Sequence, residues 1–312
     1  MLISGTGDWH IKHPRPKNRT DENYSETIFR KIEYILKESE NCFCILQAAD
    51  MFDTFKLSNV PHYLVRKTAD LLLKYCWDKN IRLFSQRGQH DLRFRSDVND
   101  TPLGILEIAE IVWIAKEEEL GENVMLYGCG YMDEIPYPKD NNKFNVLLVH
   151  KMIIEDKPLW PGQENYFTAK SFLKKYPYDL VVSGDNHNGF ISEYRNRTLI
   201  NCGSLMRNNI DQKDHKPFFV IFDTENRKYE IKEIPIDFPE DVLKLEEAVY
   251  DKDQKVRLDS FIKDLESRID SGKGFNVDYL EESRKIAKEE DLDSEVWELL
   301  EEAYKEAKEE AT

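Results

Sequence analysis

The sequence has few cysteines and no long apolar run. Its five cysteines are an odd number, and none belongs to a CxxC pair, so we expect a reduced, cytoplasmic protein. No stretch approaches the roughly eighteen consecutive apolar residues that a membrane span requires. The opening "MLISGTGDWH" has neither the basic segment nor the apolar core of a signal peptide. We therefore expect no membrane association and no export.

An overall excess of basic residues is also missing. The chain has 312 residues and a formal net charge of −16, which by itself argues against a nucleic-acid partner. The acidity is concentrated in residues 239–312, which hold 24 acidic and 12 basic residues, against 36 and 32 in the preceding part. That part is nearly neutral and contains local basic clusters at 10–19 and 87–95. Such clusters can still hold phosphates around a site.

The apolar patterning alternates between strand-like and helix-like segments. Helical spacing is found at 26–39, 63–79 and 167–176, and short apolar runs typical of strands are found at 1–7, 42–48, 81–85, 124–131, 144–149 and 179–184. After residue 190 four further strand-like segments follow, at 190–195, 197–203, 217–223 and 228–234. This pattern predicts an α/β domain that ends in a β-rich section.

A change of composition near "PIDFPED" marks a boundary. We predict one domain at 1–236 and an acidic, helical C-terminal region at 237–312. That region has two apolar helical stripes, formed by Leu258, Phe261, Ile262, Leu265 and Ile269 and by Val296, Leu299, Leu300, Ala303, Tyr304 and Ala307.

Polar side chains follow five of the predicted strands. In α/β sheets the chemistry gathers at the carboxyl ends of the strands. The residues found there are Asp8, His10, Asp50, Gln89, His90, Asp91, His150, Asp185 and His187. Each alone has a simpler explanation, because an aspartate after a strand is commonly a helix cap or a turn former. Together they place four of the seven histidines of the chain at strand ends. Imidazole and carboxylate groups are ligands for Mn²⁺, iron or Zn²⁺, and a carboxylate shared between two clusters can hold two ions about 3.5–4 Å apart for phosphate-ester hydrolysis.

The order of these blocks resembles that of the calcineurin-like metallophosphoesterases. The blocks stand here as "GDWH", "AADMFD", "GQHD", "VHK" and "GDNH", in order between residues 7 and 187. The chain is further similar to the nuclease subunit of the SbcCD-type DNA double-strand-break repair complex, in the short form encoded by bacteriophages. This second likeness is carried by "RPKNRTDENYSETIFRKIEYIL" and "NCGSLMR". The resemblance implies a two-sheet sandwich flanked by helices, in the host cytoplasm if the protein is phage-encoded.

The resemblance also implies roles for the strand-end residues. Asp8, His10 and His187 would hold a first metal ion, and Asp50 would bridge both ions. Gln89, His150 and Asp185 would complete the second site. His90 would act on the leaving oxygen of the scissile phosphate and be oriented by Asp91. The two ions would polarise the phosphate and supply a hydroxide nucleophile.

Two residues depart from the family pattern, and both fall on the second metal site. The family has Asn at the position of Gln89 and His at the position of Asp185. An anionic oxygen ligand in place of a nitrogen ligand favours Mn²⁺, or Mg²⁺, over Zn²⁺. Asp53 also stands where some relatives have a histidine near the substrate. If Asp185 is a turn residue rather than a ligand, the second ion would bind weakly.

Basic residues beside these blocks are candidates for contacts with a DNA backbone. They are Lys12, Arg15, Arg93 and Arg95, with Arg19 and Arg87 as further candidates, although each is equally well explained as a solvated surface charge. Asn201 and Arg207 are candidates for supporting the site. By resemblance, the C-terminal stripes would dock on an SMC-like, SbcC-type ATPase partner, and helices early in the chain would form a homodimer. The C-terminal region could instead be a helical cap.

The resemblance therefore predicts an Mn²⁺-dependent DNA exonuclease and endonuclease that works with this ATPase. Two alternatives stay open: a phosphodiesterase for small substrates or RNA, and a catalytically weakened scaffold subunit.

Overall fold

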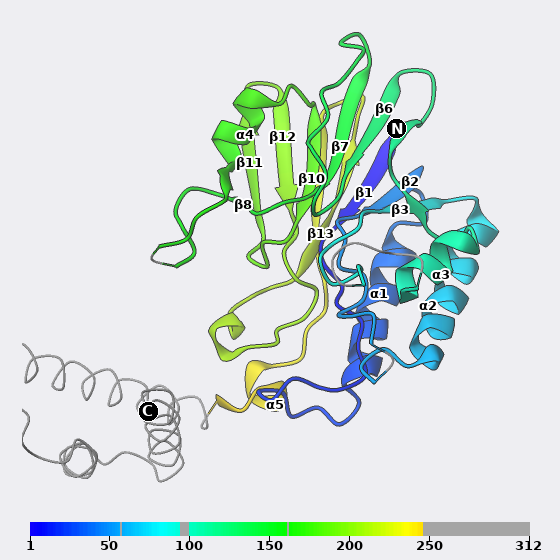
Figure 1. The fold of residues 1–312 in the computed structure, drawn as a ribbon, viewed down its shortest axis with the longest axis vertical. Coiled ribbons are helices and arrows are strands. Elements are labelled where there is room, and N and C mark those ends of the chain that lie inside the picture. The colour runs from blue at the N-terminus through cyan, green and yellow to red at the C-terminus, as the bar shows by residue number, and fades with distance from the viewer. Residues whose placement is uncertain (57, 94–99, 161, 246–312) are drawn as a thin grey trace, which may run out of the picture. The chain divides into compact units, whose positions relative to one another are not determined.

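Two six-stranded sheets form the centre of the molecule (Figure 1). The structure is a computed structural model, and it describes residues 1–245 except 57, 94–99 and 161. The first sheet has the strand order β14-β13-β1-β2-β3-β4. Its strands are β1 (Leu2–Thr6), β2 (Cys44–Gln47), β3 (Arg82–Ser85), β4 (Trp113–Ile114), β13 (Phe218–Asp223) and β14 (Lys228–Glu233).

The second sheet has the strand order β11-β12-β10-β7-β6-β5. Its strands are β5 (Glu117–Glu119), β6 (Val124–Cys129), β7 (Phe144–His150), β10 (Leu180–Gly184), β11 (Phe190–Tyr194) and β12 (Arg197–Asn201). A short pair, β8 (Ile153–Ile154) and β9 (Phe167–Thr168), lies outside both sheets. The described helices are α1 (Tyr24–Glu38), α2 (His62–Tyr75), α3 (Pro102–Ile108), α4 (Ala169–Lys175), α5 (Pro239–Val242) and the 3₁₀ turns η1 (Trp77–Lys79) and η2 (Ile210–Gln212).

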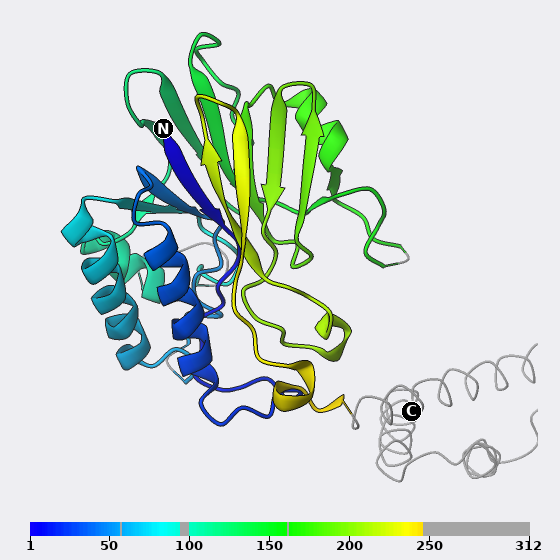
Figure 2. The same cartoon turned by 180° about the vertical axis from the view of Figure 1, so that it is seen from behind.

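Apolar side chains hold these layers together. Buried residues of both sheets, among them Leu46 and Phe84 from the first and Leu148 and Val182 from the second, form one cluster between the sheets. A second cluster joins the first sheet to α1 and α2, and a third joins the second sheet to α4. Helices therefore cover the outer face of each sheet, as the two views show (Figures 1 and 2). The predicted α/β two-sheet sandwich with flanking helices is confirmed.

The direction of the strands brings their polar ends to one edge. In the first sheet β1, β2 and β3 are parallel, and in the second sheet β6, β7, β10 and β12 are parallel. These central strands are almost wholly buried, which explains their continuous apolar runs. Parallel neighbours end at the same edge of a sheet. The residues that follow β1, β2, β3, β7 and β10 can therefore converge.

Residues Met1 to Leu243 form one compact unit. Residues 246–312 lie outside the described residues, and with them both predicted apolar stripes. The predicted boundary at 236 stays a prediction. No helix in the described residues is both long and apolar enough to cross a bilayer.

Candidate metal centre

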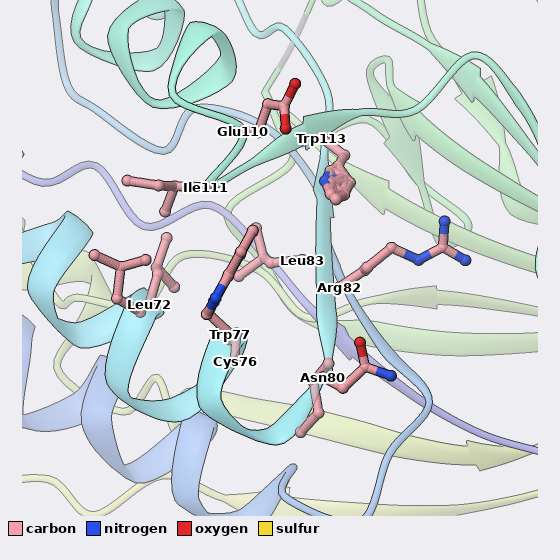
Figure 3. Close-up of a pocket in the computed structure, with 11 residues that line it drawn as sticks. Leu72, Cys76, Trp77, Asn80, Arg82, Leu83, Glu110, Ile111 and Trp113 are labelled. Atoms are coloured by element: carbon pink, nitrogen blue, oxygen red, sulfur yellow. The ribbon is translucent and has the colours of Figure 1, made fainter.

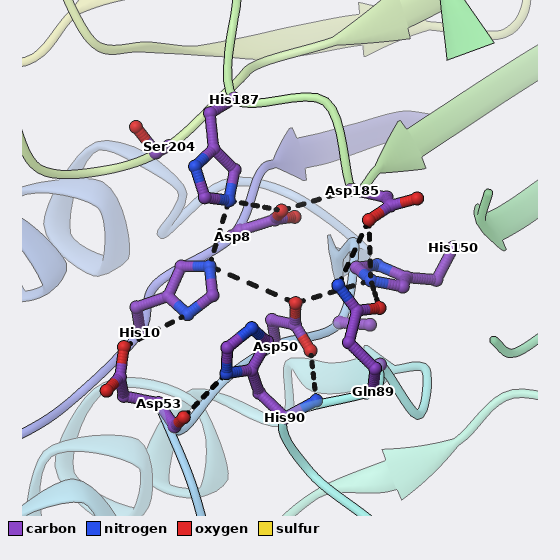
Figure 4. Close-up of polar contacts among 12 residues, drawn as sticks. Asp8, His10, Asp50, Asp53, Gln89, His90, His150, Asp185, His187 and Ser204 are labelled. Atoms are coloured by element: carbon purple, nitrogen blue, oxygen red, sulfur yellow. Dashed lines mark hydrogen bonds and ion pairs between the residues drawn. The ribbon is translucent and has the colours of Figure 1, made fainter. Parts of the chain in front are cut away.

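The first predicted metal site brings together three residues from distant parts of the chain. Nε2 of His10 lies 3.1 Å from Nε2 of His187, and Nε2 of His187 lies 3.7 Å from Oδ2 of Asp8. One ligand atom from each of the three lies within 4.8 Å of the others. Asp8 and His10 are buried, whereas the His187 side chain is 42% exposed. This is a donor set of one carboxylate and two imidazoles (Figure 4), in which His187 is the exposed member.

The second predicted site is closed by hydrogen bonds among its own members. Nε2 of His150 lies 3.0 Å from Oε1 of Gln89, and Nε2 of Gln89 donates to Oδ1 of Asp185 at 3.1 Å. Asp50 Oδ2 lies 3.3 Å from His150 Nε2. Gln89 and Asp185, the two departures from the family pattern, therefore point to the same place as His150 and Asp50. The described structure brings all seven predicted ligands together at one edge.

Asp50 stands between the two sites. Its Oδ2 atom lies 3.3 Å from Nε2 of His150 in the second site and 3.9 Å from Nε2 of His10 in the first. Asp50 is fully buried, and within the described residues its Oδ2 atom forms the ion pair with His150 but no hydrogen bond. Oδ1 of Asp8 is likewise buried and forms no hydrogen bond to any described residue. Buried carboxylate oxygens without hydrogen bonds are costly, and two bound cations would satisfy Oδ1 of Asp8 and take the place of the His150 proton beside Oδ2 of Asp50. The residues present therefore fit a pair of metal ions.

Burial and neighbouring charges shift the pKa values of His150, Asp8 and His10 in different directions. Burial opposes the charge of His150, but the neighbouring carboxylates of Asp50 and Asp8 outweigh it and raise the pKa of His150 to about 10. Burial raises the pKa of Asp8 well above its ordinary value. Burial also lowers the pKa of His10 far below its ordinary value, so that its imidazole is neutral. Metal binding requires neutral imidazoles and ionised carboxylates, so His10 already has the required protonation state, whereas His150 would have to lose a proton and Asp8 would have to be ionised.

The backbone of the ligand residues is strained. His10, Asp50 and Asp185 have φ values of 48°, 45° and 80°. Residues other than glycine adopt this left-handed region rarely, at a cost of about 1–3 kcal/mol each. Three such residues among seven predicted ligands indicate that the surrounding structure imposes their position.

Glycine next to the ligands has a steric reason. A Cβ atom on Gly88 would lie 1.9 Å from Oδ1 of Asp50, and one on Gly184 would lie 2.3 Å from Oδ1 of Asp8. Any side chain at these positions would displace a predicted ligand.

The contacts of His90 and Asp91 differ from the prediction. Asp91 does not orient the His90 ring, because its buried carboxylate accepts hydrogen bonds from the backbone N–H groups of Met51, Phe52 and Gly88 at 3.3, 3.1 and 3.2 Å. The His90 ring is instead held by Asp53, whose carbonyl oxygen lies 2.6 Å from Nδ1. A carbonyl can only accept, so Nδ1 carries the proton and Nε2 is the free nitrogen. Burial raises the pKa of Asp91 to about 8.

Two buried residues that the sequence analysis did not select tie the strand ends together. Gln47 donates from Nε2 to the carbonyls of Gly7 and Ala49 at 3.1 and 2.6 Å, and it accepts from Ser85 Oγ at 2.6 Å. Its amide thereby links the residues that follow β1, β2 and β3. The signal in the sequence was a single amide at the end of the buried run "CILQ".

The basic residues predicted to contact DNA already have partners. Lys12 binds Asp53 and Arg93 binds Asp100. Arg87 pairs with Glu107. The Arg15 guanidinium donates to the carbonyl of Thr20 at 2.6 Å. Arg95 lies outside the described residues.

Arg19 and Arg207 are buried and therefore cannot reach a ligand in solution. Arg19 pairs with Asp21 and donates to the carbonyl of Arg207. Arg207 donates to the carbonyls of Lys213 and Asp237. The prediction of a DNA contact is wrong for Arg19. Asn201 ends β12, and Arg207 lies in the loop that follows it. This loop contacts the first site through its backbone, because Ser204 N–H donates to the carbonyl of His187 and Leu205 N–H to that of Asp8.

A separate pocket of about 340 Å³ lies at the amino-terminal end of β3 (Figure 3). Its lining includes Leu72, Trp77, Arg82, Glu110 and Trp113. No predicted ligand lines it, because the ligands follow the carboxyl end of this strand. The pocket is not part of the metal centre.

Comparison with family models and with curated proteins gives no match. Solved structures with a similar arrangement include a hypothetical protein from Pyrococcus horikoshii OT3, at 14% identity and a TM-score of 0.39, covering 75% of this chain and 89% of that chain. A single mutant of Vps29 from Entamoeba histolytica has 12% identity and a TM-score of 0.34, with 75% of this chain and 100% of that chain covered. The nuclease MPE of Pseudomonas putida has 13% identity and a TM-score of 0.31, with 69% of this chain and 82% of that chain covered. Likeness at this level says nothing about the site, whose chemistry must be inferred from its own geometry.

Proposed function

We propose that this protein is a two-metal phosphodiesterase that cuts DNA. The observation that supports the chemistry is the position of Asp50, a buried carboxylate that faces the histidines of both sites. When bound, two divalent ions would polarise the phosphate and activate water. The second site offers the carboxylates of Asp50 and Asp185 and the amide oxygen of Gln89 beside one imidazole. This oxygen-rich set favours Mn²⁺, with Mg²⁺ as the second choice.

The residues of the chain supply the remaining parts of the reaction. His90 is only partly buried, and its backbone N–H donates to Oδ1 of Asp50 at 3.1 Å. Its Nδ1 is fixed by the carbonyl of Asp53, so Nε2 is the nitrogen that would interact with the substrate. A protonated Nε2 can donate to the leaving oxygen of the phosphate, which is the role of a general acid. Asp91 contributes by holding the backbone of 51–52 against Gly88.

The choice of DNA and of partners follows from the sequence resemblance. The five ordered blocks and the segments at 15–36 and 201–207 support a nuclease of the SbcCD type, acting in recombination or DNA end processing. The partner would be an SMC-like ATPase, bound through the C-terminal region, and the nuclease would form a homodimer. The site would operate in the cytoplasm.

One observation favours an alternative, a phosphodiesterase for small substrates or RNA. Lys12, Arg93 and Arg87, three of the candidates for backbone contacts, are engaged by Asp53, Asp100 and Glu107. A long polyanion would have to compete with these carboxylates, whereas a small phosphodiester needs only the metal centre.

The first experiment is Mn²⁺-dependent degradation of an end-labelled linear duplex, with His90→Ala as the matched variant. We expect cleavage by the wild type and a loss of at least 100-fold in the variant. Hydrolysis of bis-nitrophenyl phosphate without cleavage of DNA would favour the small-substrate alternative. Binding of the ATPase with no hydrolysis of either substrate would favour a scaffold subunit.

A further inference from the structure

Asp53 is placed beside the metal centre by a short backbone ladder. The N–H groups of His10 and Ile11 donate to the carbonyls of Asp50 and Met51 at 2.9 Å each, and Asp53 N–H donates back to the carbonyl of Ile11 at 3.2 Å. The segment after β2 therefore runs beside the segment after β1, with a parallel bridge between Ile11 and Phe52. This arrangement sets the position of Asp53 relative to His10.

The carboxylate of Asp53 faces the nitrogen of His10 that does not point to the metal centre. Oδ1 of Asp53 lies 3.5 Å from Nδ1 of His10, and the opposite nitrogen, Nε2, faces His187 and Asp50. Nδ1 is buried and no hydrogen bond to it is formed within the described residues, so the Asp53 carboxylate at 3.5 Å is the acceptor that faces its proton. Lys12 donates to the same Oδ1 atom of Asp53 at 2.9 Å and so restrains the carboxylate.

The backbone of the same residue holds a second histidine. The carbonyl of Asp53 accepts from Nδ1 of His90 at 2.6 Å. The rings of His10 and His90 lie perpendicular to each other with centroids 4.9 Å apart. One residue thus faces the Nδ1 atoms of both histidines.

We infer that Asp53 is a positioning residue that fixes His10 as the Nδ1–H tautomer, which leaves the Nε2 lone pair free for the first metal ion. A histidine ligand needs a proton acceptor at its second nitrogen, and outer partners of this kind typically change metal affinity by 10- to 100-fold. The Asp53 carboxylate is the proton acceptor for Nδ1 of His10, and the Asp53 carbonyl is the proton acceptor for Nδ1 of His90. The inference deepens the proposed function and rests on it only in naming a metal ion as the ligand of His10.

The competing explanation is a simple ion pair with Lys12. The Lys12 and Asp53 side chains are 14% and 21% exposed, and pairs near the surface contribute little to stability. The two explanations differ in what happens to His10. Only a positioning role links the carboxylate of Asp53 to metal affinity and to the imidazole tautomer.

Two variants of the 312-residue chain distinguish the positioning role of Asp53 from a simple ion pair with Lys12. Asp53→Ala removes the carboxylate but keeps the carbonyl that holds His90, and Lys12→Met removes the ion pair but keeps the carboxylate beside His10. Mn²⁺ affinity is measured by calorimetry without substrate, with Asp8→Ala as the control that removes a ligand. We expect Asp53→Ala to weaken binding of one ion by 10- to 100-fold, Lys12→Met to weaken it by less than about threefold, and Asp53→Asn, whose amide oxygen can still accept, to restore most of the affinity.

A second readout does not depend on metal. Nitrogen NMR of the histidine side chains in the metal-free protein should show His10 as the Nδ1–H tautomer, and Asp53→Ala should shift it towards the Nε2–H tautomer. An unchanged tautomer, or equal losses of affinity in Asp53→Ala and Lys12→Met, would overturn the inference. A wild type that binds no Mn²⁺ would overturn the proposed function, while the tautomer measurement would still decide the role of Asp53.

Discussion

Asp50 Oδ2 and His150 Nε2 lie 3.3 Å apart in the interior, with neither side chain exposed to solvent. Asp50 follows β2 of the first sheet and His150 ends β7 of the second, and they are 100 residues apart in the chain. In this structure they form an ion pair, because the carboxylates around His150 keep its imidazole protonated. A bound cation would take the place of that proton, so metal binding at this edge releases protons.

The first prediction concerns Asp50. Because its carboxylate faces both sites, Asp50→Ala should weaken the binding of both ions by more than the roughly 100-fold that marks the loss of an outer partner. Calorimetric titration with Mn²⁺ measures this, with the 65%-exposed Asp70 changed to Ala as the control. Two ions bound normally by Asp50→Ala would contradict the bridging role.

The second prediction concerns Asp185. Asp185→Asn should weaken the binding of the second ion and leave that of the first, because the Asp185 carboxylate faces the second site and the substitution keeps the backbone N–H that donates to Asp8. Asp185→His should shift the preference from Mn²⁺ towards Zn²⁺ by about tenfold, since a nitrogen ligand replaces an anionic oxygen. Competition titrations measure the ratio of the Mn²⁺ and Zn²⁺ affinities in the wild type and in this variant. Unchanged stoichiometry and turnover in Asp185→Asn would show that this residue is a turn former.

The third prediction separates His90 from Asp91. His90→Ala should lower turnover with little change in stability, because the half-buried ring makes one hydrogen bond to Asp53. Asp91→Ala should lower the free energy of unfolding by about 3 kcal/mol or more, because three buried N–H groups lose their acceptor. Urea denaturation and steady-state kinetics on both variants provide the comparison. A stable but inactive Asp91→Ala would instead support a direct catalytic role.

The fourth prediction concerns thermal stability with metal. Ligands that bind only the native state stabilise it by about 2.7 kcal/mol at 100 times Kd, which for a unit of this size corresponds to a rise in Tm of about 5–10 °C. Mn²⁺ should raise the Tm of the wild type, a chelator should reverse the rise, and Asp8→Asn should show much less of it. Equal shifts in wild type and variant would place the stabilising ion elsewhere.

The fifth prediction concerns Lys31, which is buried near Arg19 and Arg207. Burial, with these like charges, lowers the pKa of Lys31 to about 7, and its ammonium donates to the carbonyl of Leu205 at 2.9 Å. Between pH 7 and about 10.5 the unfolded chain binds the proton more tightly than the folded chain, so this group makes stability rise with pH in that window. Lys31→Met should reduce the increase of the unfolding free energy with pH in this window. The difference in unfolding free energy between wild type and variant at pH 7 and pH 9.5 tests this, and identical slopes would contradict it.

Much of the fold could be predicted from local pattern. The strands β1, β2, β3, β7 and β10 and the helices α1, α2 and α4 fall where periodicity placed them, because buried parallel strands and amphipathic helices leave strong local signals. The short elements β4, β5, β8 and α3 were not predicted. The strands β4, β5 and β8 have two, three and two residues, too few for a period to emerge. The seven residues of α3, PLGILEI, include a proline and a glycine, which are the weakest helix formers.

The sequence by itself determined which side chains follow which strands, and hence the chemical character of the site. That information is local, since a ligand and its strand are neighbours in the chain. Only the tertiary structure decided which atoms meet. His10 and His187 are 177 residues apart. The Asp91 carboxylate accepts hydrogen bonds from backbone N–H groups, whereas Asp53 faces the rings of His10 and His90. These choices depend on the packing of two sheets and on strained residues such as Asp50, whose φ of 45° is imposed by contacts that no short stretch of sequence contains.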